Sequence, residues 1–186
     1  MVIEDPATYW DQLWTDGARY RPLDETETTA LEQHAGAGEG RAALDIGSGD
    51  GSLAHHLARL GYTTIGIDCA PAAVGLAAET GATGVTFREA DIEGPEPLPA
   101  PEQPFALITA RLVYAFIADK PSFLRRVRHL LSDDGLFWVV SPLADRLRED
   151  RAGIGITADD EILLTGGWSK VHMTDLDIMR CYALRP

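Results

Sequence analysis

Residues 44–51 read LDIGSGDG, and a short apolar run that begins at Ala42 leads directly into them. A run of this length that ends in alternating glycines is typical of a buried strand followed by a tight turn. The next segment, residues 50–60, carries leucines at helical spacing on one face: Leu53, Leu57 and Leu60. The sequence therefore predicts a strand, a glycine turn and a helix in direct succession.

The same alternation continues toward the C-terminus. Further strands are predicted at residues 63–67, 84–87, 105–109 and 136–140, with helices at 71–81 and 119–131. This order is typical of parallel strands joined by crossover helices. Two last strands, 168–173 and 178–184, are joined by a turn around Asp175 and are close enough to pair antiparallel. The predicted fold is α/β, a doubly wound seven-stranded sheet, mostly parallel with one antiparallel strand.

Residues 1–41 contain no recognisable strand, and two helices are expected there, one including Tyr9 to Trp14 and one from Glu25 to His34. The chain is therefore divided into an N-terminal helical segment, residues 1–41, which is expected to act as a lid, and a main domain, residues 42–186. Between Pro95 and Pro104 lie five of the 11 prolines, so this segment is expected to be a surface connection.

Composition excludes several classes of protein. The 186 residues suffice for one well-filled core, and no apolar stretch approaches the length of a membrane span or a secretory signal. The net charge of −13 disfavours nucleic acid as a partner. Cys69 and Cys181 lie far apart without further ligands at metal spacing, so neither a disulfide framework nor a metal site is expected, and a cytoplasmic location is the default.

Asp68 is the second functional signal. It ends the second predicted strand, so it is expected beside the glycine turn at the carboxyl edge of adjacent strands. A carboxylate offers two acceptor oxygens, which match the two hydroxyl donors of a ribose. The glycine turn and Asp68 together predict a nucleoside-containing ligand.

The glycine spacing separates two ligand types. The dinucleotide fingerprint G-x-G-x-x-G requires its third glycine at position 52, where this chain has Ser52, so a nicotinamide cofactor is disfavoured. The D-x-G-x-G-x-G run from Asp45 to Gly51 instead resembles the first motif of class I S-adenosylmethionine-dependent methyltransferases, whose fold is Rossmann-like. The resemblance extends over residues 42–184 through the order of the predicted elements.

This resemblance implies S-adenosylmethionine as the cofactor and assigns residues to it. The glycine turn would line the methionine part, Asp45 would brace the turn, Asp68 would bind the ribose and Asp91 the adenine amine. The full expected set is Asp45, Gly47, Ser48, Gly49, Gly51, Asp68, Cys69, Asp91, Ile92, Thr109, Ala110 and Arg111. The N-terminal aromatics are expected to form a lid whose ring faces tolerate a sulfonium cation. The substrate or lid set is Tyr9, Trp10, Trp14, Tyr20, Tyr114 and Phe116.

The chain also departs from the family pattern. Ala106 stands where many members have Asp, and the sequence after the fourth strand offers no histidine base, which leaves Tyr114 and Arg111 as the catalytic candidates. The acceptor pocket is expected to form from the N-terminal segment, residues 111–116 and the loop after Ser141.

The expected activity is methyl transfer to a small-molecule N, O or S nucleophile, driven mainly by proximity and orientation. Because Ala106 and the missing histidine leave catalysis open, one alternative is a non-catalytic protein that binds S-adenosylmethionine as a partner or sensor. A nicotinamide-dependent oxidoreductase is the other alternative.

Overall fold

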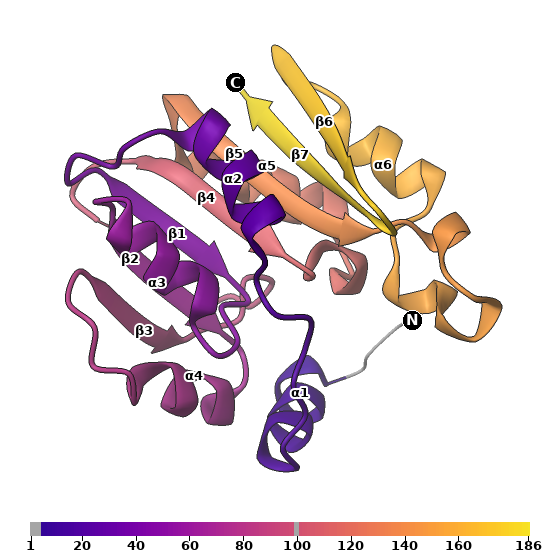
Figure 1. The fold of residues 1–186 in the computed structure, drawn as a ribbon, viewed down its shortest axis with the longest axis horizontal. Coiled ribbons are helices and arrows are strands. Elements are labelled where there is room, and N and C mark those ends of the chain that lie inside the picture. Colours follow the sequence, from indigo (N-terminus) through magenta and orange to yellow (C-terminus); the bar gives the residue numbers. More distant parts are fainter. Residues whose placement is uncertain (1–4, 99–100) are drawn as a thin grey trace.

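The strands form one sheet in the order β3-β2-β1-β4-β5-β7-β6 (Figure 1). The computed structural model describes residues 5–98 and 101–186. The parallel strands of the first half are β1 (Ala42–Ile46), β2 (Thr63–Asp68), β3 (Val85–Glu89) and β4 (Phe105–Arg111). The second half contains β5 (Leu131–Pro142), β6 (Lys170–Leu176) and β7 (Met179–Arg185), and β7 is antiparallel to both of its neighbours. The predicted sheet, seven-stranded with one antiparallel strand, is confirmed.

Helices cover both faces of this sheet. On one face lie α2 (Glu25–Ala35) and α3 (Ser52–Arg59), and on the other α5 (Lys120–Leu130) and α6 (Ala158–Thr165). Successive residues of β5 point to opposite faces, so Trp138 joins the core under α2 and α3, whereas Phe137 and Val139 join the core under α5. The strand is apolar throughout this stretch because both of its faces are buried.

The predicted boundaries differ from the observed ones mainly at the ends of elements. The hairpin turn was expected around Asp175, but β6 continues to Leu176 and the turn lies at Asp177, whose φ of 57° is left-handed. The fifth strand begins at Leu131, directly after α5, with a register shift between Phe105 and Leu107 on its neighbour. Of the predicted proline-rich connection, residues 99 and 100 lie outside the described part of the chain.

The N-terminal segment consists of two helices with different positions. Helix α1 (Pro6–Thr15) lies beside α4 (Pro71–Ala78) at the carboxyl edge of the sheet, whereas α2 packs on the sheet and buries Ala30 and Leu31 in its core. Helix α2 therefore belongs to the core of the sheet, and the expected lid stays a prediction for α1. Residues 1–4 of that segment are outside the described part.

The topology places a crevice next to β1. The chain proceeds from β1 through β2 to β3 on one side and then returns to β4 on the other side of β1. In open α/β sheets, ligands bind at the carboxyl ends of strands where the chain direction reverses in this way. The turns after β1, β2 and β4 therefore converge on one site.

Gly51 allows close packing of Phe87 and Ala77 next to this site. Its φ is +81°, and a Cβ there would lie 2.7 Å from Phe87 Cζ and 3.0 Å from the Cβ of Ala77. Gly17 has a similar φ of +82° but open space around it. We expect Gly51→Ala to lower the free energy of unfolding by about 1–2 kcal/mol more than Gly17→Ala, because only the first adds overpacking to backbone strain. Urea unfolding of both variants measures this difference, and equal losses would contradict it.

Within the described residues, no helix combines the length and apolarity that a membrane crossing requires.

Candidate functional site

The turn after β1 is held in place by the end of β2. Gly47 and Gly49 adopt φ values of 65° and 53°, which favour glycine. Two backbone amides of the turn bind the end of β2. The Ser48 amide donates to the Ile67 carbonyl at 2.9 Å, and the Gly49 amide donates to Asp68 Oδ2 at 2.9 Å. The predicted proximity of the glycine turn and Asp68 is confirmed.

Asp68 is 8% exposed, and its second oxygen, Oδ1, accepts from the Ala70 amide at 2.9 Å. Burial raises the pKa of this carboxyl above its usual value. Its two backbone bonds use only part of the acceptor capacity of a carboxylate, which has about four lone-pair positions. Asp68 therefore fixes the turn and can still accept from a ligand.

Asp45 lies beneath the same turn and is 2% exposed. Thr109 Oγ1 on β4 donates to its Oδ1 at 2.7 Å, while its Oδ2 and the Ser48 hydroxyl are buried without a hydrogen-bond partner among the described residues. This side-chain hydrogen bond joins Asp45 to β4 and not to the turn that Asp45 was expected to brace. Burial raises the pKa of Asp45 to about 7.

The raised pKa predicts a pH dependence of stability. The folded chain binds a proton at Asp45 that the unfolded chain, with a pKa near 3.8, has already released, so this contribution to stability is lost as pH rises from about 4 to about 7. Asp45→Asn mimics the neutral form and removes the effect. We expect the wild type to lose more than about 1 kcal/mol relative to this variant over that range. Urea unfolding at several pH values tests this, and parallel pH curves would contradict it.

A cavity of about 480 Å³ opens at this edge of the sheet. Predicted cofactor residues that line it are Asp45, Gly47, Ser48, Gly49 and Asp68, together with Cys69, Asp91, Ile92 and Arg111. Burial, followed by the nearby carboxylates Asp68 and Asp91, raises the pKa of the Cys69 thiol to about 12, so this thiol is neutral at ordinary pH.

Aromatic side chains of the N-terminal segment close one side of the cavity. Tyr9, Trp10, Trp14 and Tyr20 all line it, as does Phe116, whose ring centroid lies 4.9 Å from that of Trp10. Helix α1, which carries the first three, is anchored where the Ala72 amide donates to Asp11 Oδ1 at 2.7 Å. The structure therefore places these aromatic residues around the same cavity as the glycine turn, with Trp14 next to Gly49.

Four predicted residues do not line the cavity. Gly51 is the N-cap of α3 and packs toward Phe87, while Thr109 and Ala110 are fully buried within β4. Tyr114 is also fully buried, with its hydroxyl 3.5 Å from the Asp160 carbonyl, and burial raises its pKa. Its expected substrate contact does not fit this position, because the helical turn Tyr114–Phe116 directs the phenol into the core and Phe116 into the cavity.

Arg111 lines the cavity but is already paired. Its Nε donates to Glu27 Oε1 at 2.6 Å and its Nη2 to Glu27 Oε2 at 3.1 Å, and Nη2 also donates to the Pro22 carbonyl at 3.1 Å. Glu27 is 1% exposed. This pair joins the end of β4 to α2 and to the segment before it, so Arg111 is a positioning residue for the N-terminal wall.

The wall opposite the glycine turn comes from the second half of the sheet. It includes Pro142, Leu147, Arg151 and Ile154 from the segment after β5, and Ile178 and Met179 from the β6–β7 turn and the start of β7. The loop after Ser141 was expected at the acceptor pocket, whereas the hairpin residues were not. No local sequence signal marks them, because they reach the cavity only through the pairing of β7 with β5.

Metal-ligating side chains do not gather at this site: in the described ranges, no three His, Cys, Asp or Glu residues form a group that could hold an ion.

Known proteins share this arrangement. A family model described as a methyltransferase domain matches residues 37–164. The ubiquinone biosynthesis O-methyltransferase of Leptothrix cholodnii is 30% identical over 135 residues, which cover 68% of this chain and 55% of that protein. A 2-heptyl-1-hydroxyquinolin-4(1H)-one methyltransferase of Mycobacteroides abscessus is 49% identical over 53 residues, 26% of this chain and 23% of the relative. The chain thus spans between about a quarter and about half the length of these curated relatives.

Solved structures agree in fold over nearly the whole chain. An S-adenosylmethionine-dependent methyltransferase from Mesorhizobium loti has a TM-score of 0.71 at 18% identity and covers 92% of this chain and 99% of its own. The DhpI-SAM-HEP complex has a TM-score of 0.72 at 17% identity, and the match covers 96% of this chain and 95% of that one. With the domain match over more than half of its length, this chain belongs to the class I S-adenosylmethionine-dependent methyltransferase family.

Proposed function

We propose that the chain binds S-adenosylmethionine in this cavity and transfers its methyl group to a small-molecule nucleophile. One observation carries the proposal: a single cavity joins the glycine turn and the acidic strand ends to an apolar wall under an aromatic lid. The first part suits a nucleoside, and the second leaves room for an acceptor beside it.

The residues present fit such a cofactor. A volume of about 480 Å³ lies within the range of small-molecule sites. Two buried polar atoms on its wall, Asp45 Oδ2 and Ser48 Oγ, lack partners within the described part of the chain and are available to a polar ligand. Asp68 would hold the ribose, Asp91 the adenine amine, and Ile92 would pack against the ring.

When bound, S-adenosylmethionine supplies a methyl group on a positively charged sulfur. The chain contributes alignment, which is worth effective molarities of about 10⁵ to 10⁸ M for well-placed reactants. The rings of Trp10 and Trp14 would exclude water and stabilise the positive charge through their faces. Among the described lining residues there is no histidine, the Cys69 thiol is neutral, and the carboxyl groups lie in the half assigned to the cofactor. Acceptors that ionise readily or are already basic are therefore favoured.

The test is release of S-adenosylhomocysteine during incubation with thiols, amines, phenols and aliphatic alcohols. Phenols come first in the panel because the ubiquinone biosynthesis relatives are named O-methyltransferases. We expect turnover with readily ionised or basic nucleophiles and none with the alcohols. Tight cofactor binding without turnover on any nucleophile would favour a non-catalytic binding protein instead.

A further inference from the structure

The cavity has a charge division that follows the order of the strands. Its acidic lining residues all come from the turns and ends of β1, β2 and β3: Asp45, Asp50, Asp68, Asp91 and Glu93. Its basic lining residues are all arginines from the other half of the site: Arg21 before α2, Arg111 at the end of β4 and Arg151 after β5. In a chain of net charge −13, an arginine that lines a cavity favours a negatively charged ligand beside it unless a carboxylate already neutralises it.

The three arginines differ in their pairing. Arg111 is bound to the buried Glu27, and Arg21 forms an ion pair with Asp24 at 3.2 Å. The guanidinium of Arg151 makes no hydrogen bond or ion pair with any described residue. An unpaired guanidinium presents five N–H donors in a planar fork that matches carboxylate and phosphate oxygens. Among the described residues that line the cavity, Arg151 is therefore the cation available to a ligand.

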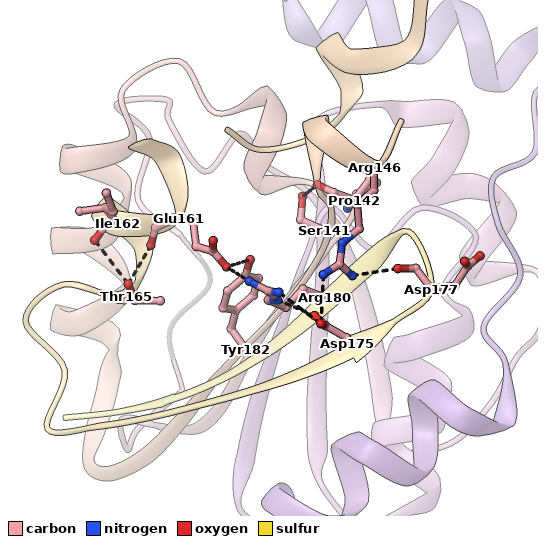
Figure 2. A network of polar contacts seen from close by, with 10 residues as sticks. All are labelled: Ser141, Pro142, Arg146, Glu161, Ile162, Thr165, Asp175, Asp177, Arg180 and Tyr182. Carbon is pink, nitrogen blue, oxygen red and sulfur yellow. Dashed lines mark hydrogen bonds and ion pairs between the residues drawn. The ribbon is translucent and has the colours of Figure 1, made fainter. Parts of the chain in front are cut away.

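The segment that carries Arg151 is held from two directions. Its ends are joined where the Ala144 amide donates to the Ile156 carbonyl at 2.9 Å and the Ile156 amide donates to the Pro142 carbonyl at 2.9 Å. Arg146 extends from the same segment to the hairpin and donates to Asp175 Oδ2 at 3.0 Å and to the Asp177 carbonyl at 2.9 Å (Figure 2).

The partners of Arg146 are fixed in turn. Arg180 on β7 binds Asp175 through Nε at 2.6 Å and Glu161 of α6 through Nη1 at 2.6 Å, and the Tyr182 hydroxyl donates to Glu161 at 2.8 Å (Figure 2). This polar network ties β6, β7 and α6 to the segment after β5. The network therefore fixes the backbone of the segment that carries Arg151, while the Arg151 side chain is exposed.

The rest of that wall is apolar. Leu147 and Ile154 flank Arg151 in the chain, and Ile178 and Met179 complete the surface from the hairpin. Given the proposed function, with the cationic cofactor at the acidic end, we infer that the methyl acceptor is an apolar molecule carrying an anionic group, a carboxylate or a phosphate, that pairs with Arg151.

Calorimetry on the full chain saturated with S-adenosylhomocysteine tests this inference. The probes are octanoate, octyl phosphate and the uncharged octanamide, which share one apolar body. Arg151→Gln removes the charge, and Arg148→Gln is the matched control because Arg148 lies on the same segment, is 78% exposed and does not line the cavity.

We expect one or both anions to bind about 5- to 10-fold more tightly than octanamide at low salt. The anion that binds more tightly shows whether the methyl acceptor carries a carboxylate or a phosphate. Arg151→Gln should abolish this preference and leave the affinity for S-adenosylhomocysteine unchanged, whereas Arg148→Gln should retain both. Absence of the preference in the wild type, or its persistence in Arg151→Gln, overturns the inference alone. Failure of the unmodified chain to bind S-adenosylhomocysteine contradicts the proposed function as well.

Discussion

Replacing Arg111 with Ala is expected to lower the free energy of unfolding by about 3–5 kcal/mol. The loss is large because the carboxylate of Glu27, 1% exposed, would remain buried without its bidentate partner. The Pro22 carbonyl would also lose a donor, which loosens the segment between α1 and α2. Urea unfolding of the variant measures the change.

The double variant Arg111→Met with Glu27→Leu is the control for this prediction. It replaces both charges with apolar groups and should recover most of the lost stability, since a buried pair often contributes little over well-packed apolar residues. A stable single variant, or a double variant as unstable as the single one, would contradict the assigned role of the pair.

Asp68→Ala is expected to weaken binding of S-adenosylmethionine by about 1–3 kcal/mol, a loss of roughly 5- to 150-fold. The variant removes the proposed acceptor of the ribose hydroxyls and also frees the Gly49 amide, which Asp68 Oδ2 now holds at 2.9 Å. Both effects act on the ligand site, so the affinity should fall in the variant that still folds. Calorimetric titration gives the dissociation constant.

Glu89→Ala provides the matched control for Asp68→Ala. Glu89 is the register partner of Asp68 on β3, but its side chain is exposed and does not line the cavity. Its variant should bind the cofactor like the wild type. An unchanged dissociation constant in folded Asp68→Ala, or an equal loss in Glu89→Ala, would contradict the role given to Asp68.

The sheet was predicted well because each strand carries a local signal in the sequence. Runs such as Ala42–Ile46 and Leu136–Val140 are apolar where both faces are buried, and glycine or proline bounds the helices between them. The hairpin turn was misplaced because Asp175 and Asp177 both suit a turn, and only the pairing of Leu176 with Met179 decides between them. Local sequence patterns therefore cannot predict a strand end that is determined by pairing with another strand.

The two halves of the site also differed in how well local sequence patterns predicted them. The glycine turn and Asp68 belong to adjacent strands with short connections, so spacing alone placed them together. The side chains of the opposite wall, such as Ile178 and Met179, arrive through an antiparallel pairing between segments far apart in the chain. Tyr114 and Phe116 were not separable by sequence because a single turn of helix decides which ring enters the core.

Calorimetric titration of the purified chain with S-adenosylmethionine, S-adenosylhomocysteine and NAD tests the central claim most directly. The account predicts saturable one-to-one binding of both sulfur compounds and no binding of NAD. Binding of NAD alone, or of none of the three to the folded chain, would contradict it.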